Sequence, residues 1–173
     1  MEPINILING LPGEMATMLA GEVAKDQRFI LIPFSVVGSD IEIQETIIAK
    51  QIVKFFKLKD DEYLKALKES EPFIAVDFVH PDVSSKKIQF SIDNQISFVM
   101  GTTEFNRQKF TPALKNSNTL SLISSNMNKQ VAGLQLMMAH LANRYPGLYK
   151  GYRLIVSEGS KSRKIGNIKI DID

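Results

Sequence analysis

The stretch INILINGLPGEM, residues 4–15, decides the fold of this 173-residue chain. Its first half is an apolar run of the kind found in a strand buried on both faces. Gly10 and Gly13 then break the run, and residues 14–25 predict a helix. The apolar face of this helix is expected to consist of Met15, Met18, Leu19 and Val23.

A strand, a glycine turn and a helix in this order open a dinucleotide-binding unit. Glycine lets backbone N–H groups approach a pyrophosphate, and the N-terminus of the helix carries partial positive charge. The spacing here is G-x-x-G and not the full G-x-G-x-x-G. A tight turn between strand and helix that binds no ligand therefore stays open as an equal alternative.

The composition excludes several classes of function. Apolar residues make up 44% and charged residues 23% of the chain, as in ordinary soluble globular proteins. The net charge of +2 is too small to favour nucleic acid or an anionic membrane. There is no cysteine for a thiolate or metal site, and the two histidines lack the carboxylate spacing of one. The sequence has no apolar run near 18 residues and no basic leader, so we expect a cytoplasmic protein. We expect it to bind a small molecule and not to bind nucleic acid, a membrane or a metal.

Residues 1–125 alternate between apolar runs and amphipathic helices. After the opening unit, strands are expected at 29–33, 73–78, 97–100 and 119–123, and helices at 60–69, 83–95 and 106–114. Residues 39–56 carry a mixed pattern, which we interpret as short strand segments at the edge of the sheet. The alternation predicts an α/β fold, a Rossmann-like parallel sheet with helices on both faces.

From Asn126 the pattern changes. Residues 131–143 predict a helix, Tyr-Pro-Gly at 145–147 stops it, and strands are expected at 152–156 and 165–172. We therefore predict a dinucleotide-binding domain at 1–125 and, at 126–173, a small α+β region of a helix plus a β-hairpin. This second region is expected to serve substrate binding or oligomerisation, and a homo-oligomer formed through the C-terminal strands stays open.

Two polar residues follow the strand expected at 73–78. Asp77 ends an apolar run. Burial there would raise the pKa of its carboxyl group. Alternatively, its side chain would cap the following turn. His80 precedes Pro81, and we interpret it as a turn residue in preference to a contact with a nicotinamide.

Six stretches carry a family resemblance in their order and spacing. Asn9, Gly10, Gly13 and Met15 match an opening VNG-x-x-G-x-M pattern. The others are PFSVVG at 33–38, VDFVHP at 76–81, GTTEF at 101–105, NMNKQV at 126–131 and RYPGLYKG at 144–151. Over roughly residues 4–165 the chain resembles the dihydrodipicolinate reductase family, and especially its plant-type branch.

The resemblance implies an NAD(P)H-dependent reductase of the lysine pathway, which passes a hydride to a cyclic unsaturated dicarboxylate. The cofactor-binding residues would be Asn9, Gly10, Gly13, Glu14, Met15, Ser35, Phe78, Gly101, Thr102, Thr103 and Asn126. Ser35 follows the second strand without an adjacent carboxylate, which favours NADPH over NADH. Lys164 would be the catalytic proton donor, and Lys129 and Lys164 would hold the anionic substrate.

The chain departs from the family pattern at the catalytic loop. Glu158 and Lys164 match the family's Glu and Lys, but Ser160 replaces its histidine, Gly166 replaces its acid, and S-G-T-A is absent. Glu104 replaces the glycine that closes G-T-T-G. The alternative is therefore a catalytically impaired module that binds the dinucleotide in a regulatory role, and a further one is an interaction scaffold that has lost both functions.

Overall fold

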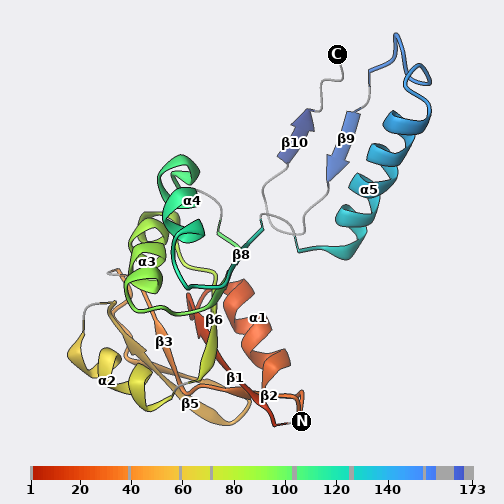
Figure 1. The fold of residues 1–173 in the computed structure, drawn as a ribbon. Coiled ribbons are helices and arrows are strands. Elements are labelled where there is room, and N and C mark those ends of the chain that lie inside the picture. Colours follow the sequence, from red (N-terminus) through yellow and green to blue (C-terminus); the bar gives the residue numbers. More distant parts are fainter. Residues whose placement is uncertain are drawn as a thin grey trace. The chain divides into compact units, whose positions relative to one another are not determined.

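The computed structural model describes residues 2–38, 40–58, 60–70, 72–102, 105–124, 127–153, 155–158 and 166–169. The chain forms two compact units, Met1–Met127 and Asn128–Asp173 (Figure 1). Among the helices in these ranges, none is long and apolar enough to cross a membrane.

The main sheet of the first unit has five strands that all run parallel. Its order is β2 (Phe29–Leu31), β1 (Ile4–Asn9), β6 (Phe73–Asp77), β7 (Phe98–Met100) and β8 (Ser121–Ile123). In the register, Asn9 lies opposite Asp77, and Asp77 lies opposite Met100. The carboxyl ends of the three central strands therefore meet at one edge of the sheet.

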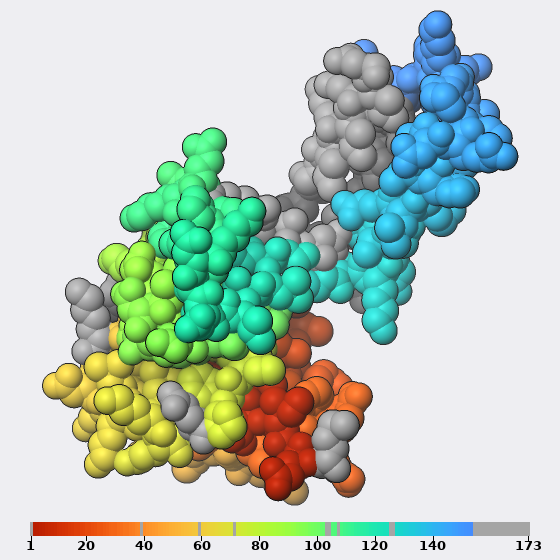
Figure 2. Space-filling model, in the orientation of Figure 1, coloured from red at the N-terminus to blue at the C-terminus, as the bar shows by residue number. Residues whose placement is uncertain are grey.

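Helices cover both faces of this sheet. Successive side chains of a strand point to opposite faces, and β1 accordingly supplies two separate cores. Ile6 and Ile8 pack with α1 (Glu14–Val23), whereas Leu7 packs with α2 (Asp61–Glu69), α3 (Pro81–Asp93) and α4 (Arg107–Lys115). In the space-filling view, α2, α3 and α4 form the yellow, yellow-green and green parts of the surface (Figure 2). The predicted Rossmann-like α/β fold is confirmed.

The apolar face predicted for the first helix is wrong in part. The buried residues of α1 are Ala16, Ala20 and Val23, whereas the side chains of Met15 and Met18 are 56% and 61% exposed. Alanines one turn apart let the helix backbone approach the sheet closely. The smaller residues, and not the more hydrophobic ones, therefore mark the buried face.

The strand segments predicted within residues 39–56 are present, but they belong to a sheet of their own, so their predicted place at the edge of the main sheet is wrong. The strands β3 (Phe34–Val36), β5 (Gln51–Phe56) and β4 (Glu45–Ile48) lie in this order, with β3 parallel and β4 antiparallel to β5. Ala49 and Lys50 have φ angles of 48° and 71°, as a two-residue hairpin turn of type I′ requires. This sheet places Val36 and the residues after it beside the first glycine turn.

The described residues of the second unit include a helix and a strand pair, as predicted. The helix α5 (Lys129–Arg144) begins two residues earlier than expected, because the Asn128 side chain accepts hydrogen bonds from the amides of Gln130 and Val131. The strands β9 (Ile155–Glu158) and β10 (Gly166–Lys169) are antiparallel.

Candidate functional site

A cleft of about 390 Å³ opens at the carboxyl ends of β1 and β6. Ligands of parallel α/β sheets bind at this edge. The cleft is lined by Gly10, Leu11, Pro12, Gly13, Gly38, Asp40, Ile41, Phe78, Val79, His80, Pro81 and Val83. The described structure therefore leaves a recess beside the first glycine turn, where the sequence predicts a pyrophosphate.

The conformation of this turn requires its glycines. Gly10 has a φ of +99°, and a Cβ atom there would lie far inside van der Waals contact with the carbonyl oxygen of Phe78. A Cβ atom on Gly13 would lie 2.8 Å from the carbonyl oxygen of Gly10. The Gly10 amide donates to the carbonyl of Val36 at 3.0 Å. The turn is thereby pressed against the end of β6 and bonded to the end of β3.

The N-terminus of α1 suits anionic oxygens. The first N–H groups of a helix have no acceptor within the helix, and Gly13, the N-cap, supplies no side-chain acceptor. The partial positive charge of the helix end adds to these donors. Glu14 and Met15 occupy the first turn with exposed side chains. Their predicted role thus depends on their backbone amides, since the Glu14 carboxylate would repel a phosphate.

Two predicted cofactor-binding residues have buried side chains that do not line the cleft. Asn9 and Ser35 are fully buried. Asn9 Nδ2 donates to Asp77 Oδ1 at 2.6 Å, and Asn9 Oδ1 accepts from the Val36 amide at 3.0 Å. Ser35 Oγ accepts from the Leu11 amide at 3.4 Å. Both side chains therefore support the turn from beneath, and the assignment of Asn9 and Ser35 to the cofactor site stays a prediction.

Comparison with known proteins assigns the first unit to a family. A family model described as dihydrodipicolinate reductase, N-terminus, matches residues 4–127. The chain belongs to the dihydrodipicolinate reductase family. The resemblance predicted from the sequence is confirmed.

Two plant relatives match almost the whole chain. It is 28% identical over 162 residues to the probable 4-hydroxy-tetrahydrodipicolinate reductase 2, chloroplastic, of Oryza sativa subsp. japonica, covering 92% of this chain and 50% of that protein. It is 28% identical over 165 residues to 4-hydroxy-tetrahydrodipicolinate reductase 1, chloroplastic, of Arabidopsis thaliana, covering 94% and 47%. The chain thus spans about half the length of the curated relatives it matches.

One solved structure is similar in part. The crystal structure of aspartate semialdehyde dehydrogenase II from Vibrio cholerae gives a TM-score of 0.49 at 14% identity, covering 83% of this chain and 47% of that chain.

The dihydrodipicolinate reductase motif that begins at Gly101 lies next to the cleft lining. The Gly101 amide donates to the Asp77 carbonyl at 3.0 Å, and Thr102 Oγ1 donates to the Val79 carbonyl at 2.6 Å. The Phe78 ring rests against the Gly101 backbone, where a Cβ atom would collide with it. The structure therefore brings together three predicted residues, Phe78, Gly101 and Thr102.

The remaining predicted site residues are Thr103, Asn126, Lys129 and Lys164. Thr103, Asn126 and Lys164 are outside the described residues. Lys129 is the first residue of α5, in the second unit, and is exposed.

Sequence reasoning missed one acid in this family member. Asp40 follows β3 by four residues and lines the cleft. In dinucleotide-binding folds an acid near this place binds the ribose hydroxyls. The preference for NADPH depended on the lack of a carboxylate beside the second strand, and the position of Asp40 removes that basis. Asp40 lies four residues beyond the end of β3, so a pattern confined to the strand end does not include it.

His80 lies in the turn that the sequence predicted and also at the cleft. It is the N-cap of α3, and its Nδ1 accepts from the Asp82 amide at 3.5 Å. Pro81 is the first residue of the helix, a position at which its missing N–H leaves no bond unmade.

A buried ion pair lies behind the cleft. The side chains of Asp77 and Lys87 are both 0% exposed, and Asp77 Oδ1 lies 4.0 Å from Lys87 Nζ. Burial raises the pKa of Asp77, and Lys87 and Asn9 partly oppose this effect. Burial lowers the pKa of Lys87, against the attraction of Asp77. Of the two outcomes predicted for Asp77, the raised pKa is confirmed.

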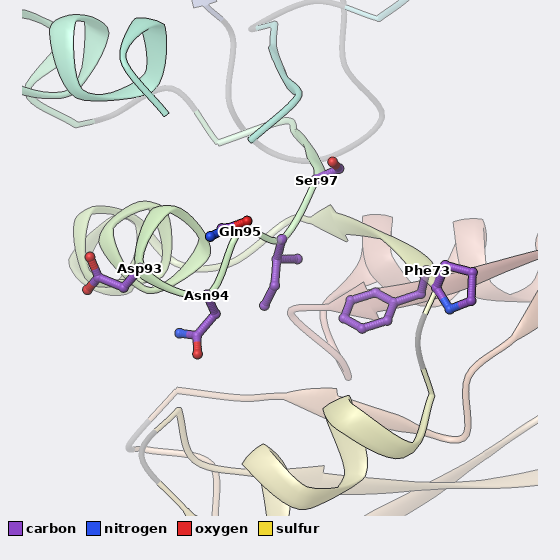
Figure 3. Close-up of a pocket in the computed structure, with 7 residues that line it drawn as sticks. Phe73, Asp93, Asn94, Gln95 and Ser97 are labelled. Carbon is purple, nitrogen blue, oxygen red and sulfur yellow. The ribbon is translucent and has the colours of Figure 1, made fainter. Parts of the chain in front are cut away.

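A second hollow lies at the opposite edge of the sheet. Its volume is about 500 Å³, and it is lined by residues at the start of β6 and before β7, including Phe73, Asn94, Gln95 and Ser97 (Figure 3). It lies at the amino ends of the strands, where parallel α/β sheets do not bind their cofactors.

Proposed function

We propose that the chain is an NAD(P)H-dependent reductase of the dihydrodipicolinate reductase type. Its substrate would be a cyclic unsaturated dicarboxylate. The observation that carries the proposal is the cleft beside Gly10 and Gly13, which opens at the carboxyl ends of parallel strands and at an uncapped helix N-terminus. Residues 1–125 would bind the dinucleotide, and residues 126–173 would serve the substrate or oligomerisation.

The residues of the cleft fit a dinucleotide. Gly10, Gly13 and the backbone of Glu14 and Met15 would hold the pyrophosphate. Asp40 is placed to accept hydrogen bonds from ribose hydroxyls. The remaining contacts would come from Phe78, Gly101, Thr102, Thr103 and Asn126 at the nicotinamide–ribose end. When bound, the cofactor supplies the hydride.

The lysines would serve the substrate. Lys129 and Lys164 would hold its carboxylates, because an ammonium group attracts an anion and donates up to three hydrogen bonds. Lys164 would also give up a proton as the hydride arrives. The departures at Ser160 and Glu104 support the second candidate, a module that binds the cofactor without turnover.

The experiment is a titration of the 173-residue chain with NADPH and with NADH by calorimetry, followed by an assay of cofactor oxidation with the family's substrate. Turnover that Lys164→Ala abolishes, with cofactor affinity kept, supports the reductase. Cofactor binding without turnover supports the module. An absence of binding by both cofactors would contradict both candidates and leave the interaction scaffold.

Gly101→Ala is expected to weaken cofactor binding more than it weakens the fold. The added methyl group must displace the Phe78 ring, which borders the cleft. We expect affinity for NADPH to fall about tenfold, and stability to fall by about 1 kcal/mol because a ring can rotate away. Titration and thermal melting measure the two effects. Gly133→Ala in α5, with nothing within 4 Å of its added methyl group, is the control, and equal affinities of the two variants would contradict the prediction.

The predicted cytoplasmic location and the homo-oligomer stay predictions. The plant relatives are named chloroplastic. Size-exclusion chromatography with light scattering measures the oligomeric state.

A further inference from the structure

Lys87 is the least expected side chain in the first unit. It lies in the middle of α3 and is 0% exposed, although lysine is almost never fully buried without a partner. Its Nζ lies 3.3 Å from Tyr63 OH and 5.3 Å from the centre of the Phe90 ring. The ammonium group is thus held by a phenol, an aromatic face and the Asp77 carboxylate, 4.0 Å away.

The pair is connected to the cleft through Asn9. An ionised carboxylate only accepts hydrogen bonds, so Asp77 Oδ1 accepts a hydrogen bond from Asn9 Nδ2. Asn9 Oδ1 is thereby left to accept from the Val36 amide. The charge on Asp77, which Lys87 balances, therefore fixes which way the Asn9 amide points.

Asn9 in turn joins the segments that form the cleft. Its main-chain carbonyl accepts from the Phe78 amide at 3.1 Å, and the Val36 carbonyl accepts from the Gly10 amide at 3.0 Å. Gly10 and Phe78 both line the cleft. The Asn9 side chain thus joins Val36, at the end of β3, to Asp77, at the end of β6, and the Gly10 turn is bonded to the same Val36 through the main chain.

A buried ion pair gives little stability, and apolar replacements of similar volume are often as stable or more stable. The stability of the fold therefore does not explain why a charged pair occupies this place. The acceptor that Asp77 offers to the Asn9 side chain is a structural reason for a polar group at this place.

We propose that Lys87 and Asp77 are positioning residues for the cofactor cleft. They orient the Asn9 side chain, and that side chain holds Val36, whose carbonyl accepts from the amide of the Gly10 turn. The identity of the ligand in this proposal rests on the proposed function. The geometry of the glycine turn does not depend on that function.

The test is the double variant Lys87→Met with Asp77→Leu, which removes both charges and leaves neither partner unpaired. We expect its melting temperature to fall by only a few degrees, because loss of the ion pair itself is near neutral, whereas the buried Asn9 Nδ2 group is left without its acceptor. We expect its affinity for NADPH and NADH to fall about tenfold, since Asn9 loses the acceptor that orients it. The amide resonances of Gly10 and Val36 in nitrogen-15 spectra should move as well. Lys86→Met, at the neighbouring exposed lysine of α3, is the control and should change none of these.

The outcomes separate this inference from the proposed function. A double variant that binds both cofactors as tightly as the wild type, with the two resonances unmoved, would overturn the positioning role. If the wild type binds neither cofactor, the proposed function fails, and the resonances alone decide the inference.

If the double variant does not fold, Lys87→Met with Asp77→Asn takes its place. The side-chain amide introduced by Asp77→Asn both donates and accepts hydrogen bonds, so it would let Asn9 point either way. A smaller shift in the same measurements is therefore expected, and no shift would overturn the inference.

Discussion

Gly10→Ala is expected to lower the melting temperature by about 10 °C and to abolish measurable binding of NAD(P)H. Two effects add at this residue. An L-residue is strained at the φ of +99°, and its Cβ atom would collide with the Phe78 carbonyl oxygen. The colliding atom is backbone, in a strand end that is hydrogen-bonded to Asn9 and cannot rotate away. We therefore expect a loss of about 3 kcal/mol, which corresponds to that temperature shift in a protein of this size.

Gly21→Ala is the matched control for this substitution. Gly21 lies within α1, and nothing lies within 4 Å of a Cβ atom added to it. Alanine should raise stability by up to about 1 kcal/mol there, because it has the higher helix propensity. Differential scanning calorimetry and cofactor titration of both variants measure the contrast. If the melting temperature of Gly10→Ala equals that of the wild type, the turn is not held against Phe78.

The main sheet could be predicted because strands buried on both faces are continuous apolar runs. The strands that end at Asn9 and Asp77 have this pattern. The second sheet could not be predicted in the same way. Its pairing of Phe34 with Lys54 joins residues far apart in the sequence, and Pro33, which separates β2 from β3, gives no sign of where the chain goes next.

The candidate site was predictable where backbone conformation demands one residue type. Gly10 and Gly13 are such positions, since a Cβ atom fits at neither. A polar side chain at a strand end is different. Asn9 and Ser35 point beneath the turn, and the sequence alone does not say which way they point. Lys87 was not predicted to be buried, for a related reason. A lysine in a helix sequence usually indicates an exposed position, whereas Lys87 lies on the buried face of α3 with Ser84, Ile88 and Ser91.

Removing one partner of the Asp77–Lys87 pair is expected to cost about 3 to 5 kcal/mol, because a buried charge is left without compensation. The two single variants should respond to pH in opposite directions. The groups that face each other here are Asp77 on β6, Lys87 on α3 and Tyr63 on α2, and burial also raises the pKa of Tyr63. Tyr63 therefore stays neutral, and the remaining partner of the pair determines the pH dependence.

In Lys87→Met the remaining group is Asp77. Its pKa in the folded protein lies above the ordinary value of 3.8, and loss of the lysine raises it further. Between the two values the folded protein holds a proton that the unfolded chain has released. The stability of this variant is therefore greatest below about pH 4, and it falls as the pH rises, by about 1.4 kcal/mol per pH unit up to the folded-state pKa.

In Asp77→Asn the remaining group is Lys87, and the sign reverses. Its pKa in the folded protein lies below the ordinary value of 10.5, and loss of the carboxylate lowers it further. Between the two values the unfolded chain holds the proton that the folded protein lacks. The stability of this variant therefore rises with pH, with the same slope, until the pH reaches about 10.5.

Urea unfolding of both variants between about pH 5 and 9, each compared with the wild type at the same pH, measures the two slopes. Subtracting the wild type removes the contribution of the exposed carboxylates, which all three proteins share. Lys86→Met should follow the wild type throughout, because its lysine is exposed. Parallel slopes in the two single variants would mean that burial does not shift the two pKa values in opposite directions. Opposite slopes would establish that burial drives each group toward its neutral form once its partner is removed, so that each charge behind the cleft depends on the other.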